Sequence, residues 1–381
     1  MLNEKPFFHF FATQTIKDIS EKDWVRLFGK DVLEGWGYHK NFEEAKIKEF
    51  HLGFLCGRRN EELVAVFPFF TTVFSFATII QGPVQKIILK LERIFPHQMK
   101  PKLLFVGLPT AEELYLGYSK EEDLGIILDG VLKKFYDLMK KERIGTILFY
   151  NLSQRHKALA ESLKRKGFAC MENFPNTKIE IRESSLEEYI KKLSRNTRKD
   201  LRRRLKKSLN LATLKTEVIT DITGIEGDIY KLYLNNFNDS DLHFETLTPE
   251  FFRNICHNMP GVARFFITRD RDKIVAFNFC LAKNDTCIDK FIGFDNELSH
   301  KYHLYHVTFC HNIDWCIKNG FRFYQMGITD YHPKLRLGAK LIPLYIYLRR
   351  INPFTNILVK LIAGLIQPKN FDPTLRRLTE E

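Results

Sequence analysis

The hydrophobic and polar positions of this chain follow the two-residue period of strands in some segments and the helical period of about 3.6 in others. In the first half, the pattern predicts strands at 51–58, 62–70 and 146–150, an apolar segment at 103–109, and helices near 121–142 and 153–166. In the second half, it predicts helices near 225–237 and 300–319, and strands at 262–268, 274–282, 286–294, 321–326 and 341–348. Thr248 before Pro249 marks the start of another helix, since threonine caps helices and proline fits their first position.

The same order of elements occurs in both halves of the chain. The segments 137–150 and 314–324 also resemble each other, each running from a helix through Lys and Gly into a strand that ends in Phe-Tyr. This likeness indicates a duplication. We therefore expect a mixed α/β protein with one domain at 1–180, a second at 181–353 and a C-terminal helix and tail at 354–381, with the chain crossing between sheets near 175–185.

Length and composition agree with two buried cores. The chain has 381 residues, of which 44% are hydrophobic and 34 are Phe, and this exceeds what one core usually holds. Its 7 Cys are odd in number and form no CxxC pair, which favours reduced thiols in a cytoplasmic protein over a disulfide framework. The N-terminal sequence lacks the pattern of a secretory signal.

Two apolar segments raise the question of a membrane. Residues 63–80 contain no charge, but they are rich in β-branched and aromatic residues and include Pro68, so they predict sheet and not a spanning helix. Residues 357–366 form an apolar helix flanked by Arg349, Arg350 and Lys369. Such a helix caps a domain or lies on a membrane surface, which would give peripheral contact through 355–367 at the inner membrane face.

The most concentrated charge lies at 191–207, KKLSRNTRKDLRRRLKK, with ten Lys or Arg and one acid, Asp200. An apolar stripe runs along the same segment: Ile190, Leu193, Thr197, Leu201, Leu205 and Leu209. Ser185 with Glu188 forms a capping box, and Ser194 offers a second cap or a kink. The segment is therefore predicted to be a helix that packs through this stripe and has a basic outer face. That face is either solvated surface or the contact for an anionic ligand, for which we single out Arg198 and Arg202.

Several phrases of the chain resemble the acyl-CoA N-acyltransferase (GNAT) superfamily, and in particular its doubled members, the Fem-type aminoacyl ligases and related acetyltransferase-like proteins. They are YIKKLSRNTRKDLRRR at 189–204, LTPEFF at 247–252, DKFIGFD at 289–295, HLYHVTF at 303–309 and GITDYHPKLRLGAKLIP at 327–343. The resemblance covers 180–353 well and the first half in outline. It implies two GNAT-like mixed-sheet domains in tandem, the first of them degenerate.

The resemblance also implies a reaction. An amine attacks the carbonyl of a thioester or ester, a general base removes its proton, and the donor's phosphates rest at a helix N-terminus. No cofactor would be bound permanently, and acyl-CoA or aminoacyl-tRNA would be the co-substrate. Lys301, Tyr302 and His303 beside the helix near 300 would contact the donor. One departure bears on CoA: residues 295–302 lack the glycines of the usual pyrophosphate loop.

Polar residues in apolar patterns mark candidate catalytic positions. Asp289 and Lys290 place charges on both faces of one predicted strand, Asp289 on the face of Phe291. One interpretation is structural: the two residues form an ion pair or lie on an exposed edge strand. The other is functional: Asp289 is the base of a site, and Lys290 lies beside the donor. Asp330, Tyr331 and Lys334 follow Gly327 in a strand-exit loop, where they form either a turn or a site for base and substrate.

The expected site requires the strand at 286–294 to diverge from that at 321–326, opening a cleft shared by Asp330, Asp289 and His303. His303, His306, Cys310 and His311 do not converge on one helical face, so we expect no metal site. The alternative function is a noncatalytic module that binds nucleic acid or a membrane surface. No motif for sequence-specific DNA recognition accompanies the charge.

Overall fold

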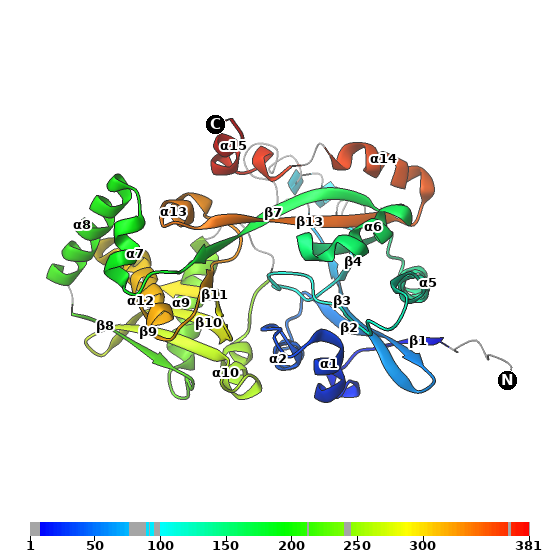
Figure 1. Ribbon diagram of the computed structural model, residues 1–381, viewed down its shortest axis with the longest axis horizontal. Helices are drawn as coiled ribbons and strands as arrows, with labels where there is room; N and C mark the ends of the chain where they lie inside the picture. Colours follow the sequence, from blue (N-terminus) through cyan, green and yellow to red (C-terminus); the bar gives the residue numbers. More distant parts are fainter. Residues whose placement is uncertain are drawn as a thin grey trace. The chain divides into compact units, whose positions relative to one another are not determined.

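The computed structural model describes residues 8–75, 89–90, 92–94, 100–211, 213–239, 245–364 and 367–380. The chain divides into two compact units, one of Met1–Phe174 with Pro343–Glu381 and one of Pro175–Ile342. We call them unit 1 and unit 2. Each unit contains a mixed sheet with helices packed against it (Figure 1).

Unit 1 is built around the strand order β1-β2-β3-β4-β6-β13, with β5 beside β3. Its strands are β1 Phe8–Thr13, β2 His51–Arg59, β3 Glu62–Val73, β4 Lys102–Val106, β5 Gly117–Tyr118 and β6 Thr146–Leu152. Its helices are η1 Ile16–Asp18, α1 Glu21–Phe28, α2 Trp36–Glu44, α5 Leu124–Lys141, η3 Gln154–His156, α6 Lys157–Arg165, α14 Pro353–Ala363, η4 Pro368–Asn370 and α15 Pro373–Glu380. Neighbouring strands are antiparallel except β4 and β6, which are parallel.

Unit 2 repeats this arrangement with the order β7-β12-β11-β10-β9-β8. Its strands are β8 Leu214–Ile219, β9 Ala263–Asp270, β10 Lys273–Lys283, β11 Thr286–Phe294 and β12 Phe323–Gln325. Its helices are α7 Leu186–Lys192, α8 Arg195–Leu211, α9 Glu226–Asp239, α10 Pro249–Asn258, α11 Asn296–Tyr302, α12 Leu304–Lys318 and α13 Tyr331–Arg336. Here β11 and β12 are the parallel pair. The two similar sequence segments thus correspond to α5–β6 and α12–β12, each a helix that leads into the second strand of the parallel pair.

Two long strands cross the boundary between the units. They are β7, Ala169–Glu180, and β13, Lys340–Arg350. Residues 178–180 of β7 pair with β12 in unit 2, whereas residues 345–350 of β13 pair with β6 in unit 1. Each unit therefore receives its last strand from the other half of the sequence. For this reason the C-terminal residues from Pro343 onward belong to the same unit as the N-terminal residues.

The sheet of unit 2 is covered on both faces, because neighbouring residues of its strands pack against different helices. Phe279 of β10 contacts the rings of Phe251 in α10 and Phe291 in β11. The next residue, Cys280, belongs to the core formed with Phe309 and other residues of α12. In unit 1, α5 packs on the sheet, and Phe135 of α5 meets Phe69 of β3 at 5.3 Å between ring centroids.

The basic segment is two helices and not one. Leu193 is extended between α7 and α8, and the hydroxyl of Ser194 accepts a hydrogen bond from the Thr197 amide at 3.3 Å, so Ser194 is the second cap. The stripe is buried from Ile190 to Leu201, and Leu205 is partly buried. Leu209 departs from the prediction: 76% of it is exposed, because α8 extends beyond the core it packs on.

The uncharged segment at 63–80 begins as strand β3, which ends at Val73, and 76–80 lie outside the described residues. Within the part of the chain that the structure describes, no helix has the length and apolar character needed to cross a membrane. The helix expected at 300–319 is also two helices, since His303 adopts a left-handed backbone (φ 52°) between α11 and α12.

Candidate functional site

The strands β11 and β12 part after three residue pairs. Thr286, Cys287 and Ile288 pair with Phe323, Tyr324 and Gln325, where β12 ends, while β11 continues to Phe294. The parallel ladder thus ends early on β11, as the predicted divergence requires, whereas the cleft expected between the strands stays a prediction. Backbone groups of β11 beyond Ile288 have no β12 strand to bond, and such groups can polarise a carbonyl that enters between the strands.

Asp289 is the first residue of β11 beyond the ladder, and its carboxylate contacts side chains of the neighbouring strands β10 and β12. The Tyr324 hydroxyl donates to Oδ2 at 2.6 Å, and the Asn278 side-chain amide donates to the same atom at 2.8 Å. The Cys280 thiol lies 3.8 Å from Oδ1. The side-chain amide of Asn312 in α12 in turn donates to the Tyr324 hydroxyl at 2.8 Å. The carboxylate is therefore held in one orientation by a chain of hydrogen bonds from the sheet and α12.

A β-bulge aims Asp289 toward α12. Phe279 of β10 pairs with Phe291, but the next residue, Cys280, pairs with Asp289, so Lys290 is an extra residue in β11. Because Phe279 and Cys280 face opposite sides of the sheet, Asp289 and Phe291 do too. Our expectation that they share a face is wrong, since the bulge breaks the alternation on which it relied.

The environment of Asp289 shifts its protonation. Burial raises the pKa of the Asp289 carboxyl to about 7, although the hydrogen bonds from Tyr324 and Asn278 and the charge of Lys334 lower it in part. Burial also raises the pKa of Tyr324 and of Tyr305, so both phenols keep their protons. A carboxylate that titrates near neutral pH, with protonated phenols beside it, has the properties of a general base.

Among the described residues, three buried polar atoms of this region have no hydrogen-bond partner. They are the hydroxyl of Tyr305 and the side-chain carbonyl oxygens of Asn278 and Asn312. The charges of Asp289 and Asp330 both act on the Tyr305 phenol. Because buried polar groups are normally satisfied, these atoms mark hydrogen-bonding capacity beside Asp289 that no described residue uses.

Known proteins match this arrangement. Residues 195–335, which include β11, α12 and β12, match the family model described as an acetyltransferase (GNAT) domain. FemX superposes with a TM-score of 0.56 at 11% identity, covering 92% of this chain and 100% of FemX. A tandem GNAT protein from the clavulanic acid biosynthesis pathway superposes with a TM-score of 0.55 at 11% identity, covering 91% of this chain and 99% of that chain.

The protein has a GNAT fold, in two copies. The C-terminal domain of a putative lysylphosphatidylglycerol synthetase from Agrobacterium fabrum shares it, with a TM-score of 0.51 and 12% identity over 92% of this chain and 96% of that chain. A curated relative, putative 8-amino-7-oxononanoate synthase 2 of Mycobacterium tuberculosis (strain ATCC 25618 / H37Rv), is 23% identical over 323 residues. That match covers 83% of this chain but 42% of the relative, so the chain spans less than half of that protein.

The loop that follows β12 in the GNAT domain carries the other predicted residues. Lys334 is buried, and its ammonium donates to the carbonyls of Met326 at 2.6 Å and Ile328 at 3.2 Å. Tyr331 is buried and donates to the Pro175 carbonyl at 2.9 Å. These two side chains hold the loop in place. Asp330 is exposed, with a left-handed backbone (φ 47°). The structure therefore brings Asp289, Asp330 and Lys334 to one end of β12.

His303 lies with the basic helix instead. Its Nδ1 is 3.5 Å from the Arg204 guanidinium of α8. Burial and then the charges of Arg204, Lys207 and Arg203 lower the pKa of His303. His303 thus contacts α8, whereas Asp289 contacts Tyr324 and Asn278, and a cleft shared by the two stays a prediction.

The residues expected beside a donor's phosphates surround α11. This helix starts at Asn296, and the Asp295 carboxylate already accepts hydrogen bonds from its first amides, at 3.1 Å from Glu297 and 3.0 Å from Leu298. Lys301 is exposed and lies over the ring of Tyr302 at 5.5 Å. Tyr302 lines a hollow of about 370 Å³ with Arg271 and the end of α8.

The basic residues on the outer face of α8 fall into two sets, one with hydrogen-bond or ion-pair partners and one without ion pairs in the part of the chain that the structure describes. Arg198 donates to the carbonyl of Lys191 at 2.6 Å, and Arg202 pairs with Glu187. Asp200 pairs with Arg203 at 2.7 Å, with Arg204 at 3.0 Å and with Arg336 at 3.5 Å. A second set is exposed and forms no ion pair within the described residues: Arg195, Lys199, Lys206 and Lys207. We missed this distinction in the sequence, because the partners of Arg198 and Arg202, the Lys191 carbonyl and Glu187, lie on α7.

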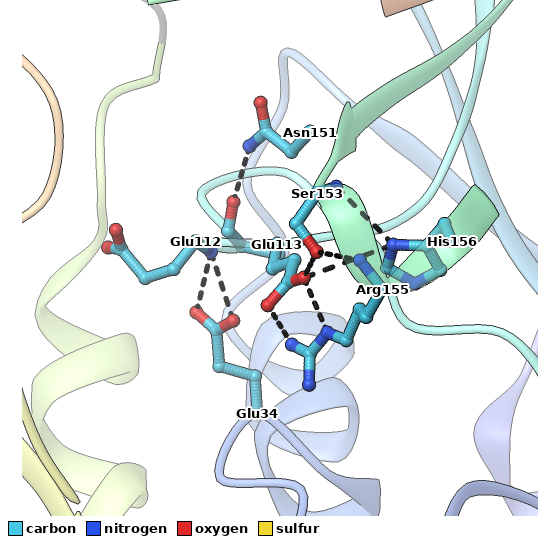
Figure 2. A network of polar contacts seen from close by, with 8 residues as sticks. Glu34, Glu112, Glu113, Asn151, Ser153, Arg155 and His156 are labelled. Carbon is cyan, nitrogen blue, oxygen red and sulfur yellow. Dashed lines mark hydrogen bonds and ion pairs between the residues drawn. The ribbon is translucent and has the colours of Figure 1, made fainter. Parts of the chain in front are cut away.

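Near the end of its parallel ladder of β4 and β6, unit 1 has a different network of polar side chains (Figure 2). There β4 and β6 pair over three residues that end at Val106 and Phe149, so the counterpart of Asp289 is Gly107. Nearby, Glu113 binds Arg155 and Ser153, and the buried Glu34 accepts hydrogen bonds from the Glu112 amide at 3.0 and 3.2 Å. This network fixes the loop after β4 to the end of β6. Unit 1 therefore has a glycine where unit 2 has the Asp289 carboxylate. For this reason we place the candidate general base in unit 2.

Proposed function

We propose that this protein transfers an acyl group to an amine and that Asp289 is the general base. The observation that carries the proposal is a carboxylate with a pKa of about 7, held by Tyr324 and Asn278 where β11 leaves β12. An amine substrate is mostly protonated near neutral pH and must lose a proton before it can attack. Asp289 in its charged form can accept that proton.

The remaining steps follow from the position of Asp289. The amine nitrogen forms a bond to the carbonyl carbon of the donor ester or thioester, and amides of β11 beyond Ile288 stabilise the resulting oxyanion. The tetrahedral intermediate then breaks its bond to the leaving oxygen or sulfur. Asp289, now protonated, can return the proton to that leaving atom. The nitrogen loses a second proton on the way from ammonium to amide, and this proton passes to solvent, so that protons and charge balance and no cofactor is consumed.

We further propose aminoacyl-tRNA as the donor, in preference to acyl-CoA. A pyrophosphate at the start of α11 would face the Asp295 carboxylate, which already occupies the free amides of that helix. The exposed unpaired cations of α8 instead offer an extended basic surface suited to a nucleic-acid backbone. FemX and the domain of the putative lysylphosphatidylglycerol synthetase, which share the fold, are consistent with an aminoacyl donor.

The test is a transfer assay with two donors. Labelled aminoacyl-tRNA and acetyl-CoA are each incubated with the protein and a panel of primary amines, and label transferred to amine or thiol released from CoA is measured. We expect transfer from aminoacyl-tRNA that Asp289→Asn slows about 100- to 10,000-fold and that Asp285→Asn, in the exposed turn before β11, leaves unchanged. Transfer from acetyl-CoA alone would contradict the proposed donor. Binding of tRNA without any transfer, in wild type and Asp289→Asn alike, would support the noncatalytic alternative.

A further inference from the structure

Helix α14, Pro353–Ala363, carries its apolar side chains outward. Five of them are largely exposed: Phe354 at 81%, Ile357 at 59%, Leu358 at 57%, Leu361 at 70% and Ile362 at 40%. Their spacing is that of one continuous stripe along a helix. On a surface helix of a globular protein this stripe would face the core, so its exposure requires an explanation.

The inward side of α14 is held by a polar residue. The side-chain carbonyl of Asn356, a buried residue, accepts a hydrogen bond from the Arg350 amide at 2.9 Å, and its amide donates to the Gly167 carbonyl at 3.1 Å. Asn352 caps the helix through the amides of Phe354 and Thr355, at 3.0 and 3.2 Å. These bonds fix the rotation of α14, so the outward direction of the stripe is built into the fold.

Basic residues flank the stripe in the sequence, and one of them, Arg349, donates to the Lys166 carbonyl at 2.6 Å. Residues 349–363 contain Arg349, Arg350 and Lys360 and no acid. The Lys360 ammonium lies 3.7 Å from the position of a Cβ at Gly167, directly after the Lys164-Arg165-Lys166 run that ends α6. Of that run, Lys166 pairs with Asp129, while Lys164 and Arg165 are exposed. An apolar stripe bordered by positive charge matches a surface that is apolar inside and anionic outside.

We propose that α14 docks this protein on the surface of a bilayer that contains anionic lipid. The helix has 11 residues, which span about 16 Å and fall short of a bilayer core, so it lies in the plane of the interface. Phe354, Leu358 and Leu361 enter the boundary of the acyl chains, and Arg350 and Lys360 contact lipid phosphates. A second copy of the chain is a poorer occupant, because pairing two such faces brings their cations together. This inference is independent of acyl transfer.

Vesicle flotation of the full-length protein tests the proposal. We expect wild type to float with vesicles of phosphatidylcholine mixed with phosphatidylglycerol, and less with phosphatidylcholine alone. Phe354→Ser with Leu361→Ser should reduce bound protein at least tenfold. Arg350→Gln with Lys360→Gln should reduce binding to the mixed vesicles and remove the preference for anionic lipid. Leu209→Ser, which alters an equally exposed leucine on α8, should bind like wild type.

Two outcomes would overturn the inference. The first is equal flotation of wild type and the Phe354→Ser, Leu361→Ser variant. The second is a wild type that does not float but forms concentration-dependent dimers that this variant dissolves, because the stripe would then be covered by another copy. Circular dichroism and thermal melting of each variant guard against misfolding, and Phe354→Trp gives a second readout. Its fluorescence should be quenched by brominated lipid beyond the wild-type background.

Discussion

The Tyr324 hydroxyl donates a 2.6 Å hydrogen bond to the Asp289 carboxylate across the short ladder of β11 and β12. One residue comes from each strand of the parallel pair, at the point where the strands part. Asn312 orients the phenol from α12, so the orientation of the carboxylate depends on three separate segments of the sequence.

Replacing Asp289 by Asn should lower kcat/KM for acyl transfer about 100- to 10,000-fold, since general bases contribute by this order. The wild-type rate should rise about tenfold per pH unit up to pH 7 and then level off, because the carboxylate is the active form and its pKa is about 7. A pH–rate profile of both proteins measures this. An unchanged profile in the Asn variant would assign the proton transfer to another group.

Replacing Tyr324 by Phe should shift the pH–rate profile to higher pH. The hydrogen bond from Tyr324 stabilises the charged carboxylate and lowers the pKa of Asp289. Without this bond, burial raises the pKa of Asp289 further. Activity should recover toward the wild-type plateau at high pH. A loss of activity that is the same at every pH would show a structural role for Tyr324 and would contradict its effect on protonation.

Replacing Asp289 by Asn should also stabilise the protein above pH 7. The pKa of Asp289 in the folded state is raised above its ordinary value of 3.8. At low pH the protonated carboxyl is buried without a charge. Its contribution to the free energy of unfolding is lost as pH rises through about 7, because the folded protein must then bury the charged form. Asparagine removes this loss and can still accept the Tyr324 hydrogen bond. We expect a gain of about 1 kcal/mol in urea unfolding at pH 8 and less at pH 5. Equal differences at both pH values would be inconsistent with a raised pKa.

Replacing Arg195, Lys199 and Lys206 by Gln should weaken tRNA binding and reduce its dependence on salt. All three side chains are exposed and off the buried stripe, so folding should be preserved. The slope of log K against log salt should fall by roughly two to three units if each contacts a phosphate. Filter binding at several salt concentrations measures the change.

The matched control for this variant replaces Lys133, Lys134 and Lys141, which are exposed on α5 of unit 1, by Gln. It removes the same charge and should bind tRNA like wild type. Asp200→Asn should act in the opposite direction, because it releases Arg203, Arg204 and Arg336 from their ion pairs. If both Gln variants bind equally, the basic helix has no specific part in binding.

Local patterns in the sequence predicted many elements of the fold. The β2–β3 and β10–β11 hairpins, the Ser185 and Thr248 caps and the helix α5 follow from residues within a few positions of each other. The resemblance to the GNAT superfamily supplied the tandem arrangement. The strand β1 and the helices α1 and α2 were missed, because their short patterns carry no period long enough to detect.

The candidate site was only partly predictable. Asp289 is visible as a charge in an apolar strand, but its partner Tyr324 follows it by 35 positions, and Asn312, which orients Tyr324, follows it by 23. Both look like ordinary core residues. The bulge at Lys290 reverses the faces that simple alternation assigns. The partners of Arg198 and Arg202 depend on how α7 and α8 pack, which periodicity does not specify.

The exchange of β7 and β13 between the units governs when the protein can fold. Thr146 of β6 pairs with Arg350 of β13, a partner roughly 200 residues later in the chain. As the ribosome makes the chain, the sheet of unit 1 keeps an unpaired strand edge on β6 until residues 345–350 of β13 have emerged. Unit 2 needs residues 178–180, which are made before the rest of it, and can complete its sheet first. During synthesis the later half of the sequence should therefore become resistant to protease before the earlier half.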